Sequence, residues 1–95
     1  MDISTVSNTV IIKGNIKSVS DYQTIKSTVD TLIGTYENII IEIKDSISIT
    51  SSIIGYFTKL VQKEGVDLKI KVGNSSLIEL FDDLNLMTLF KVKKV

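Results

Sequence analysis

Three consecutive hydroxyl side chains, Thr50, Ser51 and Ser52, are the residues of this chain best placed to do chemistry. They follow the apolar run at residues 39–43 after a short gap and precede a second apolar stretch, which predicts a buried strand leading to the start of a helix. Backbone N–H groups at a helix N-terminus have no partners within the helix and favour a nearby anion. A phosphate on Ser51 or Ser52 would meet donors and a favourable dipole, so the chain is predicted to act as a switch.

The same hydroxyls also have a purely structural interpretation, because Ser and Thr are favoured as helix caps. Three alternatives follow: Ser51 is the phosphoacceptor, Ser52 or Thr50 takes that role, or the hydroxyls only cap the helix. Lys17 is either a solvated lysine at a strand end or a cation close enough to hold a phosphate.

Composition narrows the function classes. The 95 residues fit one domain, residues 1–95, and eleven basic side chains balance eleven acidic ones, so neither nucleic acid nor anionic lipid is an expected partner. The chain has no Cys and no His, which excludes disulfides, Ser-His-Asp triads and the usual zinc ligand sets. No Gly-rich phosphate loop occurs, and we predict no cofactor and no metal. An enzyme using Lys17 or Glu42 with a serine nucleophile has no residue pair at catalytic spacing to support it.

The amino terminus carries neither the basic start nor the apolar run of a signal peptide, and no stretch approaches the ~18 apolar residues of a membrane helix. The sequence therefore predicts a cytoplasmic protein without membrane insertion.

Periodicity predicts alternating strands and helices. A first strand is expected at residues 10–16, then a helix from an N-cap at Ser20 to a stop at Gly34. Residues 39–43 are apolar except for Glu42, which is typical of a central parallel strand with helices on both faces. A helix over residues 51–64, ended by Gly65, comes next. Its stripe predicts that Tyr56 faces outward and Ile53 lies near the rim, where the two residues either form part of a docking surface or simply pack.

The last third of the chain repeats the alternation. A strand is expected at residues 68–72, a helix capped within residues 74–76, and a short final strand at residues 90–93 whose lysines protect the sheet edge. Asp82 and Asp83 are expected at the solvent-exposed end of that helix. The resulting fold class is α/β, a four- to five-stranded mostly parallel sheet with alternating helices.

The segment over residues 39–57 resembles the signature of STAS domains, the family of anti-sigma-factor antagonists and of the cytoplasmic domains of sulfate transporters. That signature runs from a hydrophobic strand with an acidic residue to Asp-Ser-Ser/Thr-Gly-Leu-Gly at a helix start. The matching residues here are Glu42, Ser51, Ser52, Ile54 and Gly55. Weaker likenesses are Gly14 at the end of the early strand, residues 74–81 as third helix, and Leu84-Asn85-Leu86 before Phe90.

The resemblance implies a single STAS-like domain without catalysis of its own, a regulator in bacterial signal transduction and transcription. Such a protein binds a kinase of the anti-sigma type, is released when the serine after the Asp position is phosphorylated, and is reset by a phosphatase. That serine is Ser51. The implied partner surface comprises Lys17, Thr50, Ser51, Ser52, Ile53 and Tyr56, on a monomer or weak dimer.

Three residues depart from the family pattern: Thr50 stands at the Asp, Ile53 at the first Gly, and Lys17 at an acidic position. They favour an alternative, in which the chain is an unphosphorylated STAS-like structural subunit of a larger signalling scaffold or lipid-transport complex.

Overall fold

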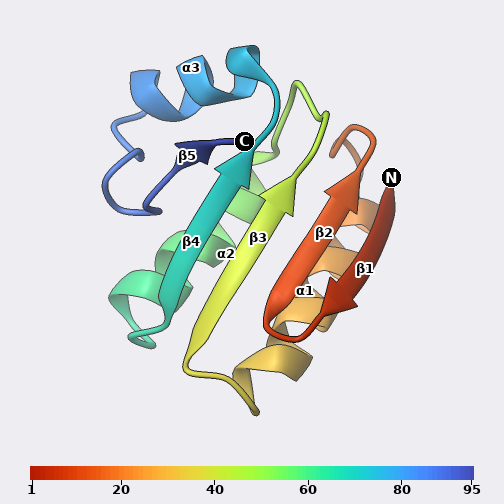
Figure 1. Cartoon of the computed structure of the whole chain (residues 1–95), viewed down its shortest axis with the longest axis vertical. Helices are drawn as coiled ribbons and strands as arrows, with labels where there is room; N and C mark the ends of the chain where they lie inside the picture. Colours follow the sequence, from red (N-terminus) through yellow and green to blue (C-terminus); the bar gives the residue numbers. More distant parts are fainter.

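A five-stranded mixed sheet carries the three helices of this chain in a computed structural model that describes all residues, 1–95 (Figure 1). In chain order the elements are β1 (Asp2–Val6), β2 (Thr9–Lys13), α1 (Val19–Ile33), β3 (Asn38–Ile43), α2 (Ser51–Gln62), β4 (Asp67–Val72), α3 (Ser75–Asp83) and β5 (Lys93–Lys94). The strands lie side by side in the order β1-β2-β3-β4-β5, with β1 antiparallel to β2 and all other pairs parallel. The predicted α/β class is confirmed.

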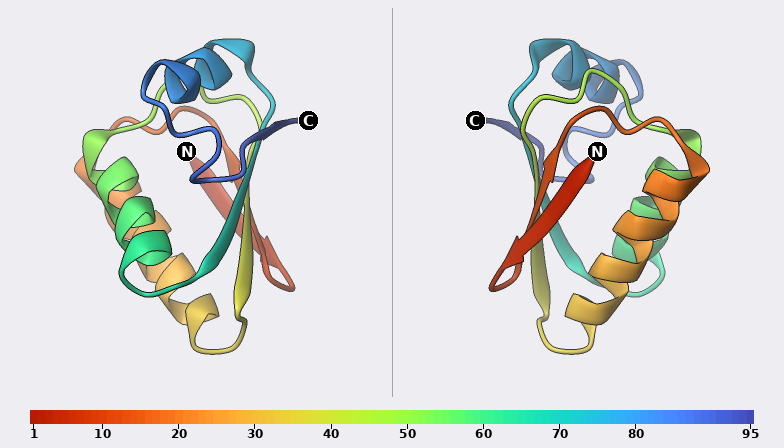
Figure 2. Two further views of the ribbon diagram at one scale, coloured as in Figure 1. Left: turned by 90° about the vertical axis from the view of Figure 1, so that its left-hand side faces the viewer. Right: turned by 90° about the vertical axis from the view of Figure 1, so that its right-hand side faces the viewer.

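Helices α1 and α2 both pack on one face of the sheet, while α3 lies across its end (Figure 2). The expectation that β3 has a helix on each face is therefore wrong, although β3 is the central strand. Strand order explains the difference: β2, β3 and β4 follow one another without reversal, and right-handed crossovers that run in one direction place every helix on the same side. Ile41 and Ile43 are fully buried against the helices, whereas Ile40 and Glu42 on the other face are only half-buried.

The core between sheet and helices holds most of the large apolar side chains. Phe90 lies at its centre, because its ring packs edge-to-face on Phe57 of α2 and on Phe81 of α3, with centroids 6.0 Å apart in both pairs. Phe90 and Val92 are buried, but the strand predicted there begins only at Lys93. The periodic pattern marked residues that fill the core rather than residues that pair in the sheet.

The amino-terminal hairpin was not predicted. Its tight turn places Ser7 at a φ of +53°, and Val6 pairs with Thr9 across it. The strand expected at residues 10–16 ends at Lys13, because Gly14 adopts a φ of +85° and turns the chain.

Helix ends follow local capping chemistry. Ser18, rather than the expected Ser20, caps α1 in a capping box with Asp21. Asn74 caps α3 as predicted, its Oδ1 accepting the Ser76 N–H at 2.8 Å. Helix α2 ends at Gln62, two residues earlier than expected. None of the three helices combines the length and the apolar character needed to cross a membrane.

Two glycines give a matched test of this packing. A Cβ at Gly73 would collide with the carbonyl oxygen of Lys44, whereas a Cβ at Gly55, inside α2, would meet nothing. We expect Gly73→Ala to destabilise the fold by about 2 kcal/mol, and Gly55→Ala to stabilise it by about 0.5 to 1 kcal/mol through its helix preference. Urea unfolding of both variants measures the difference. Equal effects of the same sign would contradict this packing.

Candidate functional site

Helix α2 starts with the hydroxyl cluster. Thr50 is its N-cap, and the Thr50 Oγ1 accepts a hydrogen bond from the backbone N–H of Ile53 at 3.3 Å. Ser51 and Ser52 occupy the first two helical positions, and both are exposed, as the sequence predicted. Because Thr50 fills the capping role, neither serine hydroxyl is needed to satisfy the helix end.

A buried serine joins the loop before α2 to the loop before α1. The side chain of Ser46 is fully buried; its Oγ accepts from the backbone N–H of Ile16 at 3.1 Å and donates to the carbonyl oxygen of Ser48 at 2.6 Å. The Oγ of Ser48 donates in turn to the carbonyl oxygen of Ile16 at 2.9 Å. These bonds fix the loop that carries Lys17 relative to the start of α2.

A shallow depression of about 290 Å³ lies between the starts of α1 and α2. Its lining residues are Lys17, Ser18, Val19, Tyr22, Thr50 and Ser52. The N-termini of two helices border it, so the partial positive charge of each helix end adds to the ammonium group of Lys17. The structure thus brings Lys17, Thr50 and Ser52 together, while Ser51 lies outside the lining.

One carboxylate lies close to this depression. Asp21, in the first turn of α1, accepts hydrogen bonds from the backbone N–H groups of Lys17 at 3.0 Å and Ser18 at 3.3 Å. The bond from Lys17 is the main cause that lowers the pKa of Asp21; burial opposes it, and the bonds from Ser18 lower the pKa further. The first turn of α2 holds no acidic residue. Asp21 is therefore engaged in capping α1, and the start of α2 carries no negative charge.

The expectation that Tyr56 faces outward and Ile53 lies near the rim is wrong. Ile53 is 0% exposed and Tyr56 only 7%, because α2 turns both positions toward the core. The ring of Tyr56 packs edge-to-face on that of Tyr22 in α1, with 6.4 Å between centroids. A partner protein can reach neither Ile53 nor Tyr56 without disrupting the fold, so neither belongs to a contact surface.

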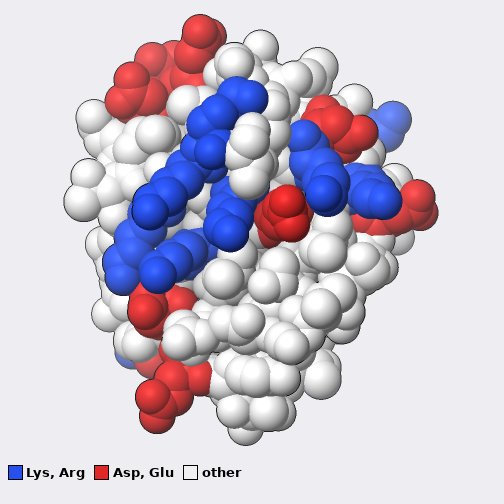
Figure 3. Space-filling view, in the orientation of Figure 1, with Lys and Arg blue, Asp and Glu red and all other residues white.

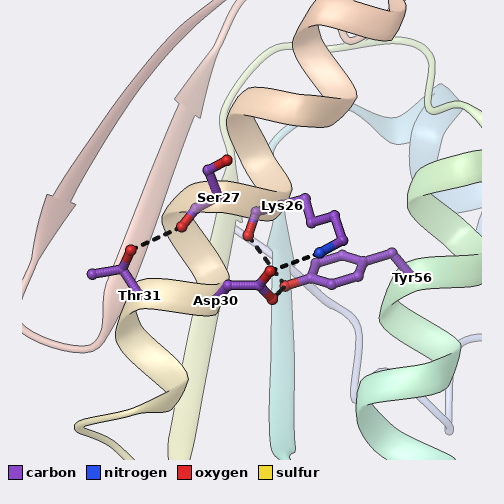
Figure 4. Close-up of polar contacts among 5 residues, drawn as sticks. All are labelled: Lys26, Ser27, Asp30, Thr31 and Tyr56. Atoms are coloured by element: carbon purple, nitrogen blue, oxygen red, sulfur yellow. Dashed lines mark hydrogen bonds and ion pairs between the residues drawn. The ribbon is translucent and has the colours of Figure 1, made fainter.

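Tyr56 instead joins the two helices. Its hydroxyl donates to Oδ1 of Asp30 at 2.5 Å, and the Nζ of Lys26 lies 2.7 Å from Oδ2 of the same carboxylate (Figure 4). The Lys26 ammonium also lies 5.5 Å from the centroid of the Tyr56 ring. Burial, and then the bond to Asp30, raise the pKa of Tyr56 above its ordinary value, as expected for a phenol that donates to a carboxylate. We call this group the Lys26–Asp30–Tyr56 cluster.

Comparison of the chain with protein-family models, with curated proteins and with solved structures found no match in any of the three. The geometry of the site and the pattern of its residues are therefore the evidence on function.

A second, larger depression of about 700 Å³ lies at the other end of the sheet, between the loops before β3 and β4. It is lined by residues 33–38 and 64–67 and contains none of the predicted site residues. In open α/β sheets ligands bind at the carboxyl ends of the strands, and this depression lies at their amino ends. The hydroxyl cluster remains the candidate site.

Two parts of the site were not foreseen from the sequence. Ser46 stands between exposed residues in a polar loop, and nothing in the local pattern marks it as buried. The bond from Tyr56 to Asp30 joins residues 26 positions apart on different helices. The one available signal was a tyrosine beside the apolar residues of α2, since a buried phenol usually finds a hydrogen-bond partner.

Ser46→Ala tests the connection between the two loops. Removal of the Oγ leaves the backbone N–H of Ile16 unsatisfied in the core, so we expect a loss of about 1 to 3 kcal/mol in the free energy of unfolding. Ser51→Ala, at an exposed position, is the matched control and is expected to change stability by less than about 0.5 kcal/mol. Urea unfolding measures both, and a Ser46→Ala variant as stable as this control would contradict the assigned role.

Asp30 makes the stability depend on pH. Burial alone would raise its pKa, but the hydrogen bonds from Lys26 and Tyr56 outweigh burial and lower the pKa below its ordinary value of 3.8. A lowered pKa contributes stability above the ordinary value, and that contribution is lost as the pH falls through the folded-state pKa. We expect Asp30→Asn to destabilise the protein near neutral pH, and by progressively less as the pH falls below 3.8.

Urea unfolding across this pH range measures the loss of stability, and Asp82→Asn, at an exposed position, is the control. A deficit of Asp30→Asn that is constant with pH would contradict the assignment.

Proposed function

We propose that this chain is a STAS-like, non-enzymatic partner-switching regulator, controlled by phosphorylation of Ser51. The observation that carries the proposal is an exposed serine at the first position of α2, next to a threonine that already caps the helix. A kinase can modify Ser51 without breaking a capping bond. The resemblance of residues 39–57 to the STAS signature supports the same serine.

The surroundings of Ser51 tolerate a phosphate. The modification adds about −1.5 to −2 charges near neutral pH, and unpaired N–H groups with the positive end of the α2 dipole lie at the same place. Lys17, on the adjacent loop, supplies a cation to the depression between the helix starts, which Thr50 and Ser52, the neighbours of Ser51, also line. Asp21 is held in the cap of α1. The folded state thus accommodates the added charge, and its main effect falls on a bound partner.

The partner surface that we propose consists of Ser51, Ser52 and Gly55, which are exposed along the first turns of α2. Glycine inside a helix costs about 0.5 to 1 kcal/mol relative to alanine, and no contact within the chain requires a missing Cβ at Gly55. Close approach of a partner backbone to α2 would make use of that missing Cβ. This surface replaces the buried Ile53 and Tyr56 as the place of contact.

An anti-sigma-type protein kinase is the proposed partner, with a phosphatase that resets the switch in the cytoplasm. The second candidate is the unphosphorylated STAS-like subunit of a signalling scaffold or lipid-transport complex. One observation favours it: Thr50 stands where the STAS signature has Asp, and the first turn of α2 holds no acidic residue.

Intact-mass spectrometry after incubation with ATP and an anti-sigma-type protein kinase from the source organism tests the proposal. We expect the wild type and Ser52→Ala to gain one phosphoryl group and Ser51→Ala to gain none. We also expect Ser51→Asp to weaken association with that kinase at least about tenfold, since a charge is placed within the contact surface. If Ser51→Ala is still phosphorylated, a residue other than Ser51 is the phosphoacceptor. Association that Ser51→Asp leaves unchanged would favour the structural subunit.

A further inference from the structure

One face of the sheet has no helix on it, as the side views show (Figure 2). Parallel strands are rarely left uncovered, because sheets of this kind normally carry helices on both faces. The residues of the open face alternate along the strands with fully buried core residues. They include Ile11 on β2, Ile40 and Glu42 on β3, Lys69 and Lys71 on β4, and Lys93 on β5.

Lysines gather on the half of this face formed by β4 and β5, where they make a continuous stripe (Figure 3). Lys71 lies directly opposite Lys93 in the sheet register, and Lys69 is two residues along β4 on the same side. Like charges in directly opposed positions disfavour strand pairing. Although basic and acidic residues are equal in number in the whole chain, positive charge is concentrated on this half of the open face.

The carboxylates near the stripe are already engaged with other lysines. Glu42, beside Lys71 in the register, lies 3.5 Å from the Nζ of Lys44, and Asp67 lies 2.7 Å from that of Lys91. Lys69, Lys71 and Lys93 form no ion pair within the chain. The stripe thus carries three unpaired positive charges.

The other half of the open face mixes three apolar side chains with polar ones, among them Ser4, Thr9 and Asn38. Ile11 and Ile40 lie half-buried on adjacent strands, and Val6 at the end of β1 is 63% exposed. The face therefore combines a few apolar side chains, set among polar ones, with a row of cations along one side.

We propose that the open face binds an amphipathic helix of a partner protein, with carboxylates placed on the lysine stripe and apolar side chains on Ile11 and Ile40. Charge complementarity requires an acidic occupant, and a helix is the element that covers the opposite face of the same sheet. This surface lies across the sheet from α2, so its occupation does not depend on Ser51.

Two synthetic peptides of about 18 residues, or five helical turns, probe this face. Both place leucines on one side of the helix, and the other side carries glutamates in one peptide and lysines in the other. We expect the full-length protein to bind the acidic peptide, with affinity that falls as salt is added, and not the basic one. Amide shifts in NMR spectra are expected on β3 and β4 rather than on α1 or α2.

Charge reversal provides the decisive variants. Lys71→Glu/Lys93→Glu is expected to weaken binding of the acidic peptide at least about tenfold and to create binding of the basic peptide. The control is Lys59→Glu/Lys63→Glu, an identical charge change on exposed positions of the helix side, which should leave both results unchanged. Lys71→Gln/Lys93→Gln removes the like-charge pair, so we expect a higher melting temperature than for the wild type. The same variant is expected not to bind the acidic peptide.

Three outcomes would overturn the proposal. The first is an acidic peptide that binds neither the wild type nor any variant, and the second is equal loss in the two charge-reversal variants. The third is that the wild-type protein binds neither peptide but does bind duplex DNA, or vesicles of phosphatidylcholine with one fifth phosphatidylserine. The stripe would then serve a different class of partner.

Discussion

The handedness of the crossover connections is the constraint on which the rest of this structure depends. A chain that passes from β2 to β3 to β4 without reversing direction must place α1 and α2 on the same face. Both helices then begin at the carboxyl edge of the sheet, so their N-termini come together around one depression. The same constraint leaves the opposite face without a helix. The convergence of helix starts and the bare sheet are therefore two results of one topology.

Hydrogen bonds and close packing then fix this edge of the sheet. The carboxylate of Asp45 accepts the backbone N–H of Gly14 at 2.7 Å, and the buried hydroxyl of Ser46 adds the bond from Ile16. On the other side, Gly73 packs against the backbone of Lys44 so closely that no side chain fits. Loops that follow three neighbouring strands are thus held to one another. A site composed of loop residues gains the positional accuracy of the sheet below it.

The sequence was sufficient for the elements whose signal is local. The helix over α2 and its start at the hydroxyl cluster follow from periodicity and capping chemistry, and so does the Asn74 cap of α3. Features that depend on tertiary contacts were out of reach. Residues 39–43 contain as many apolar side chains as a strand covered on both faces, and only the order of the strands shows that one face is open. Tyr56 was misplaced because the apolar stripe predicted for α2 excludes it, whereas the packing of α2 on α1 turns its ring toward Tyr22 and the core.

The Lys26–Asp30–Tyr56 cluster holds α1 and α2 in a fixed relative position, which limits how the domain could respond to modification. Because it ties α1 to α2 beside the aromatic packing of Tyr22 on Tyr56, the two helices resist sliding past each other. The phosphorylation that we propose at Ser51 would then alter the electrostatic potential of a rigid surface instead of its shape. Such a change in potential would act over a short range and weaken as ionic strength rises, and its main effect on a bound protein would be a faster dissociation rate.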